Sequence, residues 1–223
     1  TPGHCAAMTS LTPEILLAAY TRGLFPMGED RHDPDLFWVD PELRGILPLD
    51  RFHLPRRLAR VIRQERFAVT LDQDFRAVME GCASPAAKRQ STWINDTVLT
   101  LYGELNRRGF AHSVESRIDG ELVGGLYGVS IGAAFFGESM FSRATDASKV
   151  ALAHLVARLI VGGYRLLDCQ FITSHLRQFG TTEISRAAYH ALLGPAIAAR
   201  ADFNRAPSPL PGIEILKILM ANS

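Results

Sequence analysis

The fold is decided by residues 112–129, His112-Ser113-Val114-Glu115-Ser116-Arg117-Ile118-Asp119-Gly120-Glu121-Leu122-Val123-Gly124-Gly125-Leu126-Tyr127-Gly128-Val129. Asp119-Gly120 is a two-residue turn signal between two runs of strand-forming residues, so the sequence predicts a hairpin. Gly124-Gly125 inside the second run indicates a bulge or a close approach of another backbone. A strand, a helix and a further strand are predicted downstream, which gives a mixed α/β layer arrangement. In chain order these elements are strands 112–118, 121–129 and 133–141, helix 146–159 and strand 165–171.

The flanking segments carry further element signals. Thr12-Pro13-Glu14 starts a helix with a capping hydroxyl, a proline at the first position and an acid in the first turn, and Gly23 ends it. We expect residues 1–7, which precede Met8, not to belong to the natural protein. The other predicted elements are a turn and helix within 50–66, strand 68–72, helices 74–82 and 94–108, a strand near 182–184, helix 185–193, loops 28–34 and 88–91, and a proline-rich linker 206–211 before an apolar tail.

Composition limits the classes of function. The 223 residues are 47% hydrophobic and 21% charged, which is typical of a globular protein with a sizeable core. A net charge of +1 argues against nonspecific coating of nucleic acid but permits a local basic patch. Cys5, Cys82 and Cys169 have no metal-ligand spacing, so we expect reduced thiols and a cytoplasmic protein. We expect neither a membrane span nor a signal peptide.

Two short segments place polar side chains in apolar strand-like runs: residues 136–143 and Asp168-Cys169-Gln170. Strand alternation puts Asp168 and Gln170 on one face and Cys169 on the other, where we expect it in the core. By the same alternation Glu138 and Met140 share a face. If the two strands are neighbours, the three polar side chains converge beside an apolar surface. The alternative is that these acids are buried and satisfied by backbone or arginine partners.

Other catalytic motifs are weak or missing. Residues 137–141 begin like the hydrolase elbow G-x-S-x-G but lack its final glycine, which argues against a serine hydrolase. The seven histidines are scattered without a metal-ligand spacing, and no glycine-rich phosphate loop is present. We therefore expect neither a metal nor another cofactor.

A cluster of basic residues lies within 51–66, which contains six arginines and a single glutamate. If the segment from Pro55 is helical, Arg56, Arg60 and Arg63 share one face. The nearly uniform charge favours a surface that binds a phosphate backbone without reading bases. The alternative is a solvated helix face.

The chain resembles the bacterial leucyl/phenylalanyl-tRNA–protein transferases from about Leu11 to Leu193. The likeness rests on the order and spacing of many short motifs. They are Arg22-Gly23-Leu24-Phe25-Pro26, Phe37-Trp38, Glu80-Gly81-Cys82-Ala83, Thr92-Trp93-Ile94, His112-Ser113-Val114-Glu115, residues 122–128 and 136–143, Ala147-Ser148-Lys149, Asp168-Cys169-Gln170 and Gly180.

The resemblance implies a fold and an activity. The fold would be a small N-terminal domain, residues 1–43, and a domain 44–223 with the mixed sheet of the GCN5-related acetyltransferases. The activity would be transfer of Leu or Phe, with Met as a further candidate, from charged tRNA to proteins whose N-terminal residue is Arg or Lys. Such transfer marks the acceptor for degradation by the N-degron pathway. We expect a monomer.

The resemblance also implies roles for residues. Glu138, Asp168 and Gln170 match the family's catalytic positions, and Trp93 matches a residue near the terminal adenosine. Met27 stands in the adenosine site where the family often has tryptophan. An apolar pocket for the transferred side chain would be formed by Leu126, Phe135, Met140, Leu155 and Leu167, for which plain core packing is the alternative.

The ester of a charged tRNA is already activated, so alignment of amine and ester supplies much of the acceleration. We expect Gln170, oriented by Asp168, to hydrogen-bond the attacking amine and to accept or relay its proton. Glu138 would hold the ammonium form or anchor a water.

Two rival functions remain. One is a CoA-dependent acyltransferase of the same fold, although residues 142–146 contain no glycine for a pyrophosphate loop. The other is a noncatalytic RNA-binding module.

Overall fold

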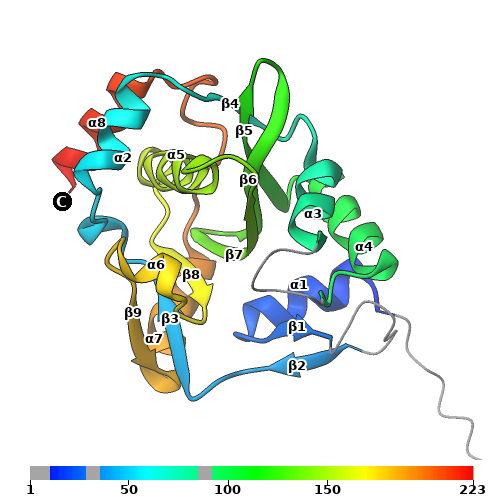
Figure 1. Ribbon diagram of the computed structural model, residues 1–223. Coiled ribbons are helices and arrows are strands. Elements are labelled where there is room, and N and C mark those ends of the chain that lie inside the picture. The colour runs from blue at the N-terminus through cyan, green and yellow to red at the C-terminus, as the bar shows by residue number, and fades with distance from the viewer. Residues whose placement is uncertain (1–10, 29–35, 85–91, 223) are drawn as a thin grey trace, which may run out of the picture.

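The protein is built around one large mixed sheet, as seen in a computed structural model that describes residues 11–28, 36–84 and 92–222 (Figure 1). Seven strands are ordered β4-β5-β6-β7-β8-β3-β9, and among the described strands β7 and β8 form the one parallel pair. A separate two-stranded sheet joins β1 and β2. The strands are β1 (Phe25–Met27), β2 (Phe37–Val39), β3 (Leu43–Ile46), β4 (Ala68–Leu71), β5 (Ala111–Ile118), β6 (Glu121–Ile131), β7 (Ala134–Ser142), β8 (Leu166–Gln170) and β9 (Thr182–Ser185).

Helices cover both faces of the large sheet (Figure 1). The first face carries α2 (Arg56–Arg63), α5 (Ala147–Gly162) and α8 (Gly212–Ala221). The second face carries α1 (Pro13–Thr21), α3 (Phe75–Ala83), α4 (Asp96–Arg107) and α7 (Arg186–Ala198). Short helices η1 (Leu49–Arg51) and α6 (Ser174–Arg177) complete the described elements. The predicted mixed α/β class is confirmed, whereas the likeness to acetyltransferases stays a prediction.

Local sequence signals explain several of these elements. Thr12 caps α1 by accepting a hydrogen bond from the Ile15 amide at 3.3 Å, and Gly23 follows the helix with φ +79°. The hairpin of β5 and β6 turns at Asp119-Gly120, where both residues have positive φ, as a type I′ turn requires. A Cβ on Gly124 would lie 2.5 Å from the Ala147 Cβ, so this glycine lets α5 pack closely on β6.

The apolar tail forms a helix that was not predicted from the sequence. In α8, Ile215, Leu216 and Leu219 are buried in the cluster shared with α2 and α5. Helix α7 is also longer than predicted, because it continues through Pro195 to Ala198. The C-terminal segment thus completes the core of the first face.

The N-terminal segment shares its core with the rest of the chain. Leu16, Tyr20 and Phe25 belong to the same buried cluster as residues of α3, α4 and α7. A domain division at residue 43 stays a prediction. Residues 1–7, Cys5 and the predicted loops 28–34 and 88–91 lie outside the described residues, apart from Gly28. No described helix is long and apolar enough to cross a membrane.

Candidate active site

Strands β7 and β8 bring the predicted catalytic residues together. The ladder between them covers Ala134 to Phe136 on β7 and ends at the pair Phe136 and Asp168. Beyond that pair the described parts of the two strands are not paired with each other. Glu138 and Gln170 lie just past this point, and Gln170 Nε2 donates to Glu138 Oε1 at 3.0 Å. The polar groups therefore sit where two parallel strands part, just past the last pair of their ladder.

Glu138 is half-buried in a network of tyrosine hydroxyls. The Tyr20 hydroxyl donates to Glu138 Oε1 at 2.6 Å. The Tyr102 hydroxyl lies 2.5 Å from that of Tyr20 and 3.3 Å from Glu138 Oε2. Burial raises the pKa of Glu138 to about 7, because it outweighs the lowering by the tyrosine hydrogen bonds, and the nearby charge of Asp168 raises it further. The carboxylate can thus exchange a proton near neutral pH.

Burial also raises the pKa of Tyr20 and Tyr102, and the charge of Glu138 adds to this effect. Both tyrosines consequently act as neutral hydroxyls at physiological pH. Both are almost completely buried, on α1 and α4. Neither was predicted to belong to the site, because a tyrosine on an apolar helix face is predicted to be a core residue, just as a leucine is. Both hydroxyls hydrogen-bond the Glu138 carboxylate, which supplies the polar partner that a buried tyrosine hydroxyl requires.

A bulge in β7 corrects one expectation from strand alternation. Tyr127 pairs with Ser139 and Gly128 with Gly137, so Glu138 is an extra residue without a partner on β6. The bulge reverses the faces of the following residues, and Met140 packs against the cluster of the first face. Glu138 instead contacts tyrosines of the second face. The prediction that Glu138 and Met140 share a face is therefore wrong.

Asp168 is fully buried and held by an arginine from β3. Arg44 donates from Nε to Oδ1 at 3.0 Å and from Nη2 to Oδ2 at 2.6 Å, and the Tyr189 hydroxyl donates to Oδ2 at 2.7 Å. The guanidinium lies 4.4 Å from the ring centroids of both Phe25 and Tyr189. Burial acts to lower the pKa of Arg44, but the hydrogen bonds and charge of Asp168 prevail and raise it. Asp168 is thus a paired carboxylate with both oxygens occupied.

Gln170 is positioned through its main chain. Its amide donates to Asp168 Oδ1 at 2.7 Å, and its φ of +60° lies in the left-handed region, which is rare for glutamine. The side chain then reaches Glu138. No described residue donates a hydrogen bond to Gln170 Oε1, so this oxygen can accept one from a substrate amine. Asp168 and Gln170 share a face, as strand alternation predicts.

Cys169 lies on the opposite face, as predicted. It packs partly buried against the cluster of the first face, and burial raises the pKa of its thiol. A thiol with a raised pKa is a poor nucleophile at neutral pH.

The five residues expected to form an apolar pocket come together in the cluster of the first face. Four of them are exposed by 3% or less, and Met140 is partly buried at the edge of the cluster. The four are Leu126, Phe135, Leu155 and Leu167. These four side chains are part of the packed core in this structure. Of the five residues, Met140 is the one on the part of β7 that lies beyond its pairing with β8.

The two residues expected at the adenosine lie in neighbouring segments. Trp93 and Met27 both pack against the cluster of the second face. A Cβ placed on Gly28, the residue after Met27, would lie 3.5 Å from the Trp93 Cβ. The side of the sheet that carries the Glu138 carboxylate is thus also the side that carries Trp93.

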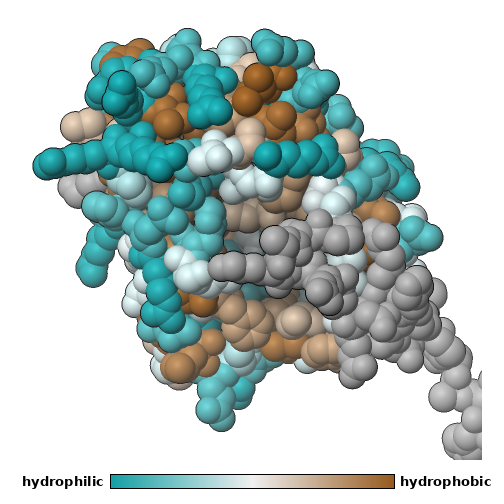
Figure 2. Space-filling view, in the orientation of Figure 1, coloured by the Kyte–Doolittle hydropathy of each residue, from teal (hydrophilic) through white to brown (hydrophobic). Residues whose placement is uncertain are grey.

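The predicted basic face lies on α2, on the opposite side of the molecule from α3 and α4 (Figure 1). Leu58 and Ile62 are buried, and Arg56, Arg60 and Arg63 are exposed without an ion pair among the described residues. Figure 2 shows hydrophilic side chains over this part of the molecule. The predicted division of the helix into an apolar and a basic face is confirmed.

The arrangement suits acyl transfer to an amine. A carboxylate with a pKa near neutrality lies beside a carboxamide with a free acceptor oxygen, and both lie at the edge of diverging strands. Within residues 11–28, 36–84 and 92–222 no group of three or more His, Cys, Asp and Glu is placed to hold a metal ion. A carboxyl group whose pKa lies near 7 can serve as a general acid or base, so the fold and the site are those of a protein suited to group transfer, that is, of the transferase class.

Comparisons with known proteins narrow this class. The sequence model of leucyl/phenylalanyl-tRNA protein transferase matches residues 46–194, and that of its N-terminal domain matches residues 9–42. Proteins named leucyl/phenylalanyl-tRNA–protein transferase are similar over nearly their whole length. The one from Nitrobacter winogradskyi is 55% identical over 219 residues, 97% of each chain. The one from Paramagnetospirillum magneticum is 59% identical over 198 residues, 89% of this chain and 95% of the relative. The chain belongs to the leucyl/phenylalanyl-tRNA–protein transferase family.

Proposed function

We propose that the protein transfers Leu or Phe from charged tRNA to the N-terminal Arg or Lys of acceptor proteins. Membership of the family supports the donor and the reaction. The observation that carries the proposal is the contact between Glu138 and Gln170 where β7 and β8 part. We also propose a cytoplasmic location, because charged tRNA is made and used there, and a role in marking acceptors for degradation.

Glu138 accepts the proton of the attacking amine in this proposal. The amine attacks the ester carbonyl, a C–N bond forms, and the C–O bond to the terminal ribose breaks. The amine proton passes to the Glu138 carboxylate, and the ribose oxygen leaves with a proton. Glu138 is suited to both transfers because its pKa is about 7. Gln170 Oε1 accepts a hydrogen bond from the amine and aligns it.

Asp168 has a positioning role. Its two oxygens already accept hydrogen bonds from Arg44, Tyr189 and the Gln170 amide. Its carboxylate is also the counter-charge of the buried Arg44. Asp168 therefore fixes the backbone of Gln170.

The donor is proposed to lie across the point where the strands part. Trp93 and Met27 contact the terminal adenosine, and the transferred side chain enters beside Met140 toward Leu126 and Leu155. The partly buried position of Met140, against the nearly complete burial of the deeper residues, supports entry there. The division into domains 1–43 and 44–223 and the monomeric state are proposals of the same kind.

A transfer assay tests the proposed function. The donors are tRNAs charged with Leu, Phe, Met or Arg, and the acceptors are peptides that differ in their first residue. We expect product from Leu and Phe donors with peptides that begin with Arg or Lys. Acetyl-CoA serves as the competing acyl donor. Acetylation of the same peptides without aminoacyl transfer would contradict the proposal, and tRNA binding without any transfer would favour a noncatalytic RNA-binding module.

Met140→Phe is expected to discriminate between the two donors. The larger side chain fills space at the entry to the proposed pocket, so transfer of Phe should fall more than transfer of Leu. A difference of a methylene or more in an apolar pocket changes binding by about 1–3 kcal/mol, or about 10- to 200-fold in the ratio of rates. The measurement is kcat/KM for both charged tRNAs. Equal losses with a lowered unfolding temperature would mean core damage and would contradict the assignment of Met140.

The triple change Arg56→Ala, Arg60→Ala, Arg63→Ala is expected to weaken binding of Leu- and Phe-charged tRNA alike. Each phosphate contact that is lost should reduce the slope of log affinity against log salt by about one unit. Reaction with a minimal aminoacyl-adenosine donor should be unchanged, because that donor is too short to reach α2. The measurement is tRNA affinity across a salt series beside turnover of the minimal donor.

A matched control replaces three exposed arginines elsewhere, Arg76, Arg107 and Arg200, by alanine. It removes the same net charge from the protein. We expect a smaller change of the salt slope than in the α2 variant. Equal slopes in the two triple variants would show that only net charge matters and that α2 is a solvated face.

A further inference from the structure

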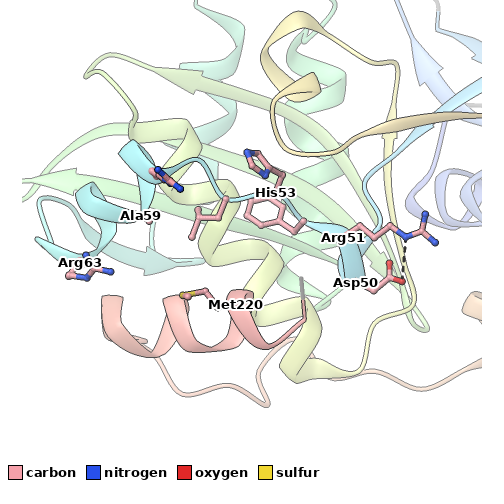
Figure 3. Close-up of a pocket in the computed structure, with 9 residues that line it drawn as sticks. Asp50, Arg51, His53, Ala59, Arg63 and Met220 are labelled. Atoms are coloured by element: carbon pink, nitrogen blue, oxygen red, sulfur yellow. Dashed lines mark ion pairs between the residues drawn. The ribbon is translucent and has the colours of Figure 1, made fainter.

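An open cavity of about 700 Å³ lies between η1, α2 and α8 (Figure 3). Its rim carries Arg51, His53, Arg56 and Arg63, and Asp50 is the one acid among the lining residues. The ion pair of Asp50 and Arg51 is long, at 4.0 Å between Oδ2 and Nε. Among the described residues Arg56 and Arg63 have no ion pair. The cavity therefore presents uncompensated positive charge to an anionic ligand.

The same cavity has an apolar wall. Met220 on α8 is 71% exposed and projects toward the segment that carries His53 and Ala59 (Figure 3). Leu54 and Phe52 also line it, and the Phe52 ring stacks on Phe179. An isolated phosphate would leave this apolar surface in water. A ligand that carries both a phosphate and a flat apolar ring would cover it.

The cavity lies within reach of the proposed active site. Ile46 on β3 is the strand partner of Asp168, and Asp50 on the rim is only four positions further along the chain. At no more than about 3.6 Å per residue, the Cα atoms of Ile46 and Asp50 are within about 14 Å of each other. A nucleic acid whose end lies at Gln170 can thus occupy the cavity with an internal nucleotide.

We propose that the cavity binds one unpaired nucleotide of the tRNA, with the base between Met220 and His53 and the phosphate against Arg56 and Arg63. This inference rests on the proposed function and adds a site for a single-stranded nucleotide to the backbone contacts of α2. A sulfur and an imidazole are suitable partners for the face of a base. Paired nucleotides of a duplex stem would not fit, because their bases are stacked inside the helix.

The test uses two uncharged RNA probes and the full chain. One probe is an acceptor-stem hairpin with its unpaired 3′ tail, and the other is the same stem with a blunt end. Met220→Asp places a negative charge where the base would lie, and affinity is measured by fluorescence anisotropy. We expect Met220→Asp to weaken binding of the tailed probe about fivefold or more, as loss of one stacked base does, and to weaken the blunt probe less. Ile213→Asp is the matched control, because Ile213 is 50% exposed on the same helix and does not line the cavity.

Equal weakening of both probes by Met220→Asp would overturn the proposal, and so would equal effects of Met220→Asp and Ile213→Asp. No effect on either probe would also overturn it. Turnover of the minimal aminoacyl-adenosine donor is measured with each variant. If the wild-type protein transfers an amino acid neither from that donor nor from charged tRNA, the proposed function is wrong. If it does transfer but Met220→Asp leaves the affinity for the tailed probe unchanged, only the proposed nucleotide site is wrong.

Discussion

Replacing Glu138 with glutamine is expected to lower kcat for aminoacyl transfer by about 10²- to 10³-fold, as loss of a general base does. The amide keeps the size of the side chain and can accept the hydrogen bonds from Tyr20 and Gln170. It cannot take the proton of the attacking amine. The measurement is single-turnover transfer from Leu-charged tRNA to a peptide that begins with Arg.

The stability of the Glu138→Gln variant separates a catalytic effect from unfolding. The folded-state pKa of Glu138 is raised above its unfolded value, so the folded protein loses stability as the pH rises from about 4.5 to about 7. The amide has no such charge to bury. We expect the variant to unfold at the same or a higher temperature than the wild type at pH 8. A lowered unfolding temperature would attribute the loss of activity to the fold.

Asp168→Asn is expected to destabilise the protein as well as to slow transfer. The substitution leaves the guanidinium of Arg44, which is 1% exposed, without a buried counter-charge. Breaking a buried ion pair at one partner costs about 3–5 kcal/mol of unfolding free energy. Asparagine has one acceptor oxygen where aspartate has two, so the Gln170 amide competes for it with Arg44 and Tyr189, and transfer should remain slow at temperatures where the variant is folded. Chemical denaturation and transfer by the folded fraction are the two measurements.

Two further variants test this explanation. The double variant Asp168→Asn/Arg44→Met is expected to lose less stability than the sum of the single variants, because the second change removes the unpaired charge. Cys169→Ala changes the neighbouring residue on the opposite face and should leave transfer almost unchanged. Strictly additive losses of stability in the double variant would contradict the explanation by an unpaired buried charge. Loss of turnover in a folded Cys169→Ala variant would contradict the assignment of the two strand faces.

Sequence signals predicted the parts of the fold that depend on neighbouring residues. The Asp119-Gly120 turn, the Thr12 cap and the order of strands around them are local features with known geometry. Helix α8 was not predicted, because its stability comes from burying Ile215 and Leu219 on α2 and α5 rather than from a capping signal. The secondary structure of such segments is determined by tertiary contacts, which local sequence signals do not reveal.

The same distinction applies to the candidate site. Alternation in β8 placed Asp168, Cys169 and Gln170 on their observed faces. It failed in β7, because the bulge at Glu138 depends on how β7 pairs with β6 and leaves no mark in the sequence. Arg44 and the tyrosines were missed for a related reason. They reach the site from segments far away along the chain, and nothing in their own neighbourhood distinguishes them from core or surface residues.

Whether Glu138 accepts the proton of the attacking amine is tested by the pH dependence of the ratio of wild-type to Glu138→Gln kcat/KM. Ionisation of the acceptor amine, with a pKa of about 7.7–8.0, affects both enzymes and cancels in the ratio. The carboxylate form of Glu138 is lost as the pH falls through its pKa of about 7. We predict a constant ratio above that pH and a fall of about tenfold per pH unit well below it. A ratio that does not change between pH 5.5 and 8.5 would contradict the claim.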